Sequence, residues 1–326
     1  MTQGKKYLVL GAAILGMGAL RLPFEKKLTD ELYAAHLLPP KLEVRTGEKI
    51  GQTFSAVSLG GLRTLVATFL NLRAFGFFSE QKWADVEETF DTIVDLAPRT
   101  RYYWDTGSWH QAYNAASYYL YESEIPALRR KLLWRESVLK GKAFLERGIR
   151  NNPDDPALWE RLGVLLSDSN KIAAFGSPAE AYEQAYDAFM SAVATGNSRD
   201  YTKRAALYSL ARVPGREGEA LKLAREIHQE QERIPPTVLA LLFVLSYHEQ
   251  PTQPVMSLVN SIFPDKRTAY DILGNLWLRS REHYPVYGIA QAVSQIEAYF
   301  NIPEEESLLK VPISPPTNMD DYFIRK

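Results

Sequence analysis

Apolar residues recur at steps of three and four over most of the chain, which is the spacing of an amphipathic helix. The first such stripe follows Ser58 and comprises Leu62, Leu65, Val66, Phe69 and Leu72. A second helix is expected after Ser79, its predicted cap, with an apolar stripe at Val86, Phe90, Ile93 and Val94. No run of alternating apolar and polar residues predicts a strand. The pattern therefore predicts an all-α protein.

Signals for helix starts support the same prediction further along the chain. Asp155 before Pro156 is typical of an N-cap followed by proline in the first turn. Ser177 and Glu180 have the spacing of a capping box. Prolines punctuate the chain after that point. We expect further helices over residues 199–212, 217–232, 235–248, 253–263, 266–282 and 286–300.

A repeated motif is present within these helices. The tetratricopeptide unit, a helix pair of about 34 residues, has Trp-x2-Leu-Gly in its first helix and small, large and small residues followed by proline in its second. Trp159, Leu162 and Gly163 match the first string. The second string is matched by Ala185, Phe189 and Ala192, with Asn197 in the usual place of proline.

The same strings occur upstream. One closing string is Gly141, Leu145, Gly148 and Pro153, and an earlier one is Val86, Phe90, Ile93 and Pro98. Trp104 lies six residues after Pro98, and Trp159 lies six residues after Pro153. Compared with the standard unit, about 21 residues are in excess between Trp104 and Gly141 and about ten between Trp159 and Ala185, which we expect to lengthen the turns. The predicted fold is a right-handed α-solenoid of divergent tetratricopeptide-like (TPR) helix pairs over 58–250, with capping helices over 251–310.

The N-terminus is typical of a membrane anchor or signal peptide. Lys5 and Lys6 precede an apolar run from Tyr7 to Leu20. Fourteen helical residues span about 21 Å, less than the hydrocarbon core of about 30 Å, but Arg21 can snorkel and extend the span to Phe24. We predict a retained anchor over residues 1–24, with residues 7–24 in the bilayer. A cleaved signal peptide and a buried helix are the alternatives.

The sequence also predicts a membrane topology, a linker and a tail. The basic residues before the run weakly favour a single-pass protein of a bacterial inner membrane whose bulk is periplasmic. Residues 25–57, which contain Pro39, Pro40 and Gly47, are expected to form a linker. The tail over residues 311–326 is expected to be extended, because it contains Pro312, Pro315 and Pro316. It could dock on a partner or on a groove of its own chain, or remain disordered.

Composition removes several classes of chemistry. The chain has no cysteine, which excludes thiolate chemistry. Its formal net charge of −1 provides no overall electrostatic field that would attract nucleic acid. Its five histidines do not have metal-binding spacing. No phosphate loop or Gly-x-Ser-x-Gly is present, and Ser108 is merely near His110 in sequence. We expect no catalytic residue, cofactor, metal, nucleic-acid partner or small-molecule substrate. The paired carboxylates of an enzyme would have to come from charged stretches such as Asp320–Asp321 or Glu304–Glu306.

Arg63 and Arg73 are candidate partner-binding residues. They lie on one predicted helix, about 80° apart around its axis, so both can border its apolar face. There they would pair with a partner's carboxylates or with lipid phosphates. Pairing within the chain to the acidic second helix is the favoured interpretation, and binding to a partner is the alternative.

Aromatic residues cluster between Tyr102 and Tyr121, in the predicted first helix of a pair, which lines the concave groove. The candidate partner-binding residues are Tyr103, Trp109, His110, Tyr113 and Asn114. Tyr103, His110 and Asn114 are expected to be the most exposed. For the cluster as a whole core packing is the favoured role, and exposure to a ligand is the alternative.

Charge is segregated along the chain. Residues 80–95 are mainly acidic and residues 129–150 mainly basic. We interpret them as helices of neighbouring repeats that pair by charge. A basic patch for anionic headgroups or nucleic acid is the alternative.

The stretch from Gly60 to Tyr119 contains Gly-Gly-Leu-Arg, Leu-Asn-Leu-Arg-Ala, Leu-Ala-Pro and Trp-His-Gln-Ala-Tyr-Asn-Ala-Ala. In these strings it resembles bacterial membrane-anchored tetratricopeptide proteins of undefined function. The resemblance implies a short anchor, a helical-repeat body and no catalytic residues. The expected function is that of a non-catalytic scaffold or accessory subunit that binds integral or peripheral membrane proteins. A soluble periplasmic binding protein and an enzyme embedded in helical repeats are the alternatives.

Overall fold

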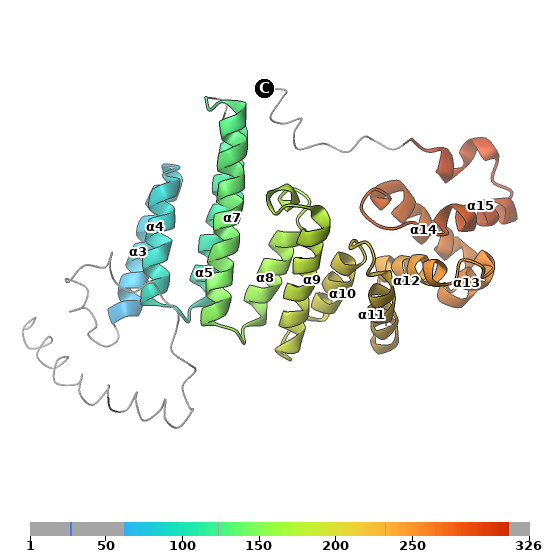
Figure 1. Cartoon of the computed structure of the whole chain (residues 1–326), viewed down its shortest axis with the longest axis horizontal. Helices are drawn as coiled ribbons and strands as arrows, with labels where there is room; N and C mark the ends of the chain where they lie inside the picture. Colours follow the sequence, from blue (N-terminus) through green and yellow to red (C-terminus); the bar gives the residue numbers. More distant parts are fainter. Residues whose placement is uncertain (1–26, 28–61, 123, 232, 313–326) are drawn as a thin grey trace, which may run out of the picture. The chain divides into compact units, whose positions relative to one another are not determined.

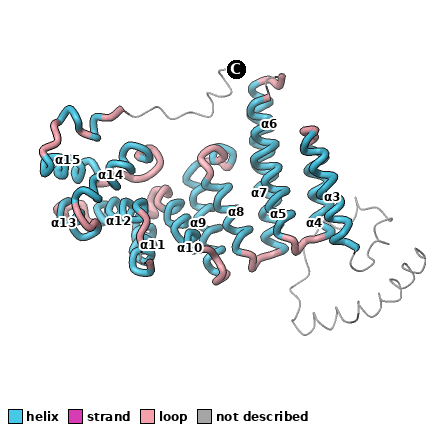
Figure 2. Tube along the Cα trace, turned by 180° about the vertical axis from the view of Figure 1, so that it is seen from behind, coloured by secondary structure: helices cyan, strands magenta, loops and turns pink. Residues whose placement is uncertain are grey.

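The computed structural model describes residue 27 and residues 62–122, 124–231 and 233–312. The predicted anchor, most of the linker and most of the tail lie outside these ranges. Every regular element in the described part is helical (Figure 2), so the all-α prediction is confirmed. None of the described helices combines the length and the apolar character that a bilayer crossing requires.

The contacts divide the chain into two compact units, residues 1–158 and 159–326. The boundary falls inside helix α8 (Pro156–Ser167). It therefore lies within the region over which the sequence predicts repeats.

The first unit begins with an antiparallel helix pair, α3 (Leu62–Ser79) and α4 (Trp83–Leu96), which lie side by side in Figures 1 and 2. A tight connection joins them, in which Gln81 has a φ of 57°. Ser79 does not cap α4, contrary to the prediction. It is the last residue of α3, and its hydroxyl donates to the carbonyl of Gly76 at 2.8 Å. The N-cap of α4 is Lys82.

The second pair of this unit has unusually long helices. Its first member is a continuous helix made of α5 (Arg101–Trp109), the π-helix η2 (His110–Ala115) and α6 (Ala116–Tyr121). Its second member is α7 (Ala127–Asn151). The residues in excess between Trp104 and Gly141 thus lengthen the two helices, and the expectation of a long turn is wrong here.

Glycines on α7 set how closely this pair packs. A Cβ on Gly148 would lie 2.9 Å from Cγ of Trp104, and one on Gly141 would lie 2.6 Å from Cβ of Ala112. Trp104 is fully buried, and its indole nitrogen donates to the carbonyl of Pro98 at 2.8 Å. The small residues and the tryptophan of the predicted motif are therefore packed against one another, as in close-packed protein interiors.

Opposite charges pair between the acidic and basic helices of the first unit. Lys140 on α7 lies 3.0 Å from Glu87 on α4, and Arg147 lies 2.7 Å from Asp91. The Arg147 guanidinium also lies over the ring of Trp104. The interpretation of these segments as charge-paired helices is confirmed for the two pairs.

The second unit contains α9 (Pro178–Ala194), α10 (Asp200–Leu210), α11 (Glu217–Glu230) and α12 (Pro236–Glu249). The capping box of Ser177 and Glu180 is confirmed, and the carboxylate of Asp155 accepts from the backbone N–H of Ala157 at the start of α8. Residues 168–177, with a short 3-10 turn at Ile172–Ala174, connect α8 to α9. A lengthened turn is thus confirmed after Trp159.

The two motif tryptophans differ in burial. Trp159 is half-buried, whereas Trp104 has no exposed surface. Gly163 nevertheless has the packing role that its motif predicts, because a Cβ there would lie 2.8 Å from the ring of Phe189 on α9.

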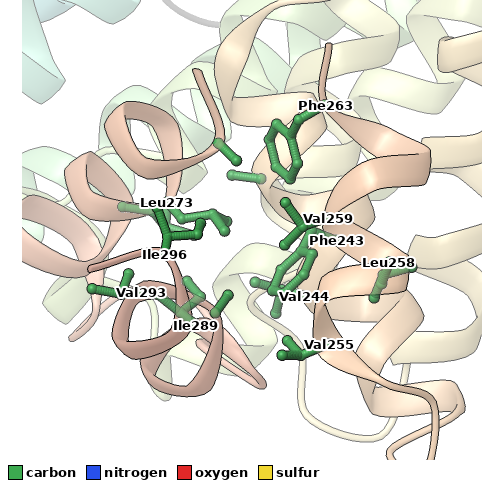
Figure 3. Packing of buried hydrophobic residues seen from close by; sticks show 14 residues of the cluster. Phe243, Val244, Val255, Leu258, Val259, Phe263, Leu273, Ile289, Val293 and Ile296 are labelled. Carbon is green, nitrogen blue, oxygen red and sulfur yellow. The ribbon is translucent and has the colours of Figure 1, made fainter. Parts of the chain in front are cut away.

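The chain continues with α13 (Val255–Ile262), α14 (Lys266–Ser280), α15 (Ile289–Phe300) and 3-10 turns at Glu304–Glu306 and Leu308–Lys310. Figure 3 shows how apolar side chains from α12 to α15, among them Phe243, Val259, Leu273 and Ile296, form one core. The buried carboxylate of Glu297 accepts from the hydroxyl of Ser307 at 2.7 Å and from the N–H of Leu308 at 2.9 Å. These bonds hold the final turn against the core.

Candidate protein-interaction surface

The outer face of α3 is an exposed apolar strip. Leu65, Phe69, Leu72 and Phe75 are 50%, 63%, 64% and 69% exposed. Their spacing places all four on one side of the helix, and the opposite side, with Ala67 and Ala74 buried, packs on α4. Burial of these four side chains in a complex would contribute on the order of 5 kcal/mol before association costs. The predicted stripe exists, but α4 does not cover it.

Arg63 and Arg73 are both exposed on the same helix. The guanidinium of Arg73 lies 5.2 Å from the centre of the Phe77 ring, so its position is partly fixed by a cation–π contact. By helical geometry Arg73 borders the strip, whereas Arg63 lies near the side that carries Ala67 and Ala74, so the prediction that both arginines border the apolar face is wrong for Arg63.

A π-turn occupies the middle of the helix over residues 101–121. His110–Ala115 has π-helical hydrogen bonding, which inserts one extra residue into the turn. Helix α7 approaches closely here, since a Cβ on Gly141 would also lie 2.9 Å from the carbonyl oxygen of Ser108. Insertions of this kind re-aim the side chains around them and recur at functional sites.

An aromatic pair lies at this turn. The rings of Trp109 and Tyr113 stack with centroids 4.2 Å apart and planes inclined by 17°. Trp109 is 48% exposed, and Tyr102, seven residues earlier and so on the same helix face, is 56% exposed. Large aromatic side chains with polar tips are frequent anchors of protein interfaces. Two of the predicted candidates, the exposed Trp109 and the half-buried Tyr113, therefore lie together.

Tyr103, His110 and Asn114 have different surroundings. Tyr103 is only 7% exposed, so the expectation that it faces a ligand is wrong. His110 and Asn114 are half-buried, whereas the sequence predicts them among the most exposed residues of the stretch. Their side chains contact each other, with the Asn114 amide nitrogen 3.0 Å from His110 Nδ1.

His110 joins three helices of the first unit. Its ring lies 4.9 Å from that of Phe78 on α3 and 5.4 Å from that of Phe90 on α4. Burial lowers the pKa of His110 from its ordinary value, because the charged ring loses hydration. The neutral imidazole is therefore a packing group that links α3 and α4 to the π-turn.

Two surface features were missed by the sequence reading. On α7, Leu128, Leu132 and Leu139 are exposed, and their spacing by four and seven residues places them on one face. In the second unit, a groove with a volume of about 720 Å³ is lined by aromatic residues that include Trp277, Tyr284 and Tyr287. The sequence Tyr-Pro-Val-Tyr-Gly at residues 284–288 is the local signal of this groove, but by itself Pro285 indicates only a helix boundary.

Comparison of the chain with models of protein families, with curated proteins and with solved structures finds no match in any of the three.

Proposed function

We propose that this protein is a non-catalytic helical-repeat scaffold, an accessory subunit of a membrane-associated bacterial assembly. In this proposal the helix pairs are divergent TPR-like units of a right-handed solenoid. The packing of Gly148 on Trp104 and of Gly163 against Phe189 supports this, because close approach at small residues is the physical basis of the repeat motif.

The exposed apolar face of α3 carries the proposal. An apolar helix face in a folded protein is normally buried, and a larger exposed patch is typical of an interaction site. The stacked rings of Trp109 and Tyr113 add a second anchor in the same unit. The partner is proposed to be a membrane subunit with an apolar segment that contacts Leu65, Phe69 and Leu72 and with an acidic side chain that pairs with Arg73.

The proposal includes a tether at the inner membrane. Residues 7–24 are proposed to remain as a single-pass anchor, with the helical body in the periplasm. The apolar run and its basic flanks support this. Extraction of membranes with alkaline carbonate, followed by N-terminal sequencing of the protein, is the test. Retention of the intact N-terminus in the membrane pellet is expected, whereas a mature chain that starts after residue 20 and is released into the supernatant would contradict the tether.

The binding role is tested by affinity purification of the tagged chain from detergent extracts. We expect a stoichiometric partner with the native chain and loss of most of it with the double variant Trp109→Ala, Tyr113→Ala. Tyr299→Ala is the matched control, because Tyr299 is an exposed aromatic residue of the second unit. Recovery of the native chain as a lone monomer would contradict the proposal.

A further inference from the structure

The groove of the second unit is built from three helices and the loop before the last of them. Tyr247 and His248 come from the end of α12, Trp277 from α14, and Tyr284, Pro285 and Tyr287 from the loop before α15. The His248 ring stacks on that of Tyr287, with centroids 4.3 Å apart. The lining is thus dominated by rings and proline.

The walls of this groove are held in place by the core beneath them. Tyr247, Trp277 and Tyr284 pack against the apolar cluster shown in Figure 3. Gly288 has a φ of 76°, and a Cβ there would lie 2.5 Å from the ring of Tyr247, so only glycine lets the loop approach α12 so closely. The guanidinium of Arg212 lies 4.1 Å from the centre of the Tyr284 ring. A preformed groove loses little entropy on binding.

An aromatic groove of this kind suits one class of peptide. Polyproline II segments bind between aromatic rings, because proline packs on the ring faces and the segment is already extended before it binds. Its backbone carbonyls make no internal hydrogen bonds and can accept from polar groups at the rim. His248, Tyr287 and Gln291 are exposed at this groove and can supply such donors.

The chain itself carries a proline-rich segment that begins near the groove. The described residues end at Pro312, and the tail continues for 14 residues with Pro315 and Pro316. The carbonyl of Val311 accepts from Arg281 at 3.1 Å, and the same guanidinium lies 5.0 Å from the centre of the Trp277 ring. A single side chain, that of Arg281, therefore links the last described residues to Trp277, which lines the groove.

The reach of the tail is sufficient. At about 3.1 Å per residue, a polyproline II segment of this length spans roughly 40 Å. The adjacent Pro315 and Pro316 both fall within the segment that would be bound. Because the segment is tethered, its effective concentration at the groove is about millimolar, and a weak contact suffices to keep it bound.

We infer that the groove lined by Tyr247, Trp277, Tyr284 and Tyr287 is a binding site for a polyproline II segment and that the chain's own tail, residues 313–318, occupies it. The inference does not depend on the function proposed above, because it concerns a different unit and a different ligand. It also implies that a proline-rich segment of another protein must displace the tail to bind.

Engineered disulfide formation in the full-length chain tests this inference. The native chain has no cysteine, so the double variant Gln291→Cys, Ser314→Cys contains only the two introduced thiols. Gln291 is at the groove rim, and Asn260 on α13 is an exposed residue that does not line it. We expect the Gln291→Cys, Ser314→Cys pair to close intramolecularly at least tenfold faster than the control pair Asn260→Cys, Ser314→Cys under the same mild oxidant.

Substitution within the tail separates docking from chance collision. Adding Pro315→Ala and Pro316→Ala to the first pair leaves both thiols in place and should lower the closure rate to that of the control. Equal rates for the two thiol pairs, or a rate that the proline substitutions do not change, would overturn the inference. Disulfide-linked dimers that form faster than the intramolecular bond would also overturn it, because the tail would then occupy a second copy.

Discussion

Helices α3 and α12 are both rich in apolar residues but lie in opposite environments. Both are apolar around most of their circumference. On α12, side chains such as Leu241, Phe243 and Val244 are completely buried, because α11, α13 and α14 pack around the helix. On α3, Phe69 and Leu72 remain more than half exposed, and α4 is the main neighbour among the described helices.

The two helices differ in what covers their apolar faces. Apolar residues on every side of a helix predict that it is surrounded. In α12 the apolar residues on every side are covered by other helices of the same chain. For α3 the described part of the chain covers one side, and the partner proposed above would cover the other.

The largest expected effect comes from truncating one phenylalanine on each helix. Phe243→Ala removes a fully buried ring and should lower the free energy of unfolding by about 3–5 kcal/mol. Phe69→Ala removes a ring that is 63% exposed, and in the purified chain it should cost less than about 1 kcal/mol. Urea unfolding followed by circular dichroism measures both. Equal losses would mean that α3 is already covered in the isolated protein.

Substitution of glycine by alanine is expected to change stability in opposite directions on a closely packed and on an open helix face. Gly141→Ala should lower the free energy of unfolding by about 1–3 kcal/mol, because the new Cβ would lie 2.6–2.9 Å from Cβ and N of Ala112. Gly76→Ala on α3 has open space and should raise stability by about 0.5–1 kcal/mol through helix propensity. Thermal unfolding compares the two variants. Stabilisation by both would contradict the close packing of α7 on the π-turn.

The smallest expected effect is a pH dependence at the contact between α3 and the π-turn. Burial lowers the pKa of His110, so below about pH 6.5 the unfolded chain binds a proton that the folded chain resists. The stabilisation from the neutral ring is therefore complete above this pH and is lost as the pH falls. His110→Gln should reduce the loss of melting temperature between pH 7.5 and pH 5.5. An unchanged pH dependence would show that His110 is not desolvated there.

The helices were largely predictable because their signals are local. The capping box at Ser177 and the aspartate before Pro156 determined two helix starts correctly. The steps of three and four also predicted α10 to α15 closely, since this periodicity reflects burial on one face. Ser79 misled the prediction because a serine hydroxyl can equally bond back to a carbonyl of its own helix, as it does at Gly76.

The candidate surface was less predictable because exposure depends on neighbours. Nothing local distinguishes Tyr103, which is buried, from Tyr102, which is exposed. The π-turn at residues 110–115 shifts the positions of the following side chains around the axis, and its insertion leaves no sequence mark. The aromatic groove combines Tyr247, Trp277 and Tyr287, which are far apart in sequence, so it emerges only when α12 and α14 pack together.

Photo-crosslinking from the exposed face of α3 tests whether this face binds another polypeptide, as we propose. A photoreactive phenylalanine analogue at position 69 replaces an exposed ring with a similar one, and the same analogue at Tyr299 in the second unit is the control. After irradiation of native membranes, mass spectrometry identifies the attached peptide. We expect position 69 to attach to one other polypeptide and position 299 to attach to none. Attachment of position 69 only to residues 1–61 of the same chain, or to nothing, would contradict it.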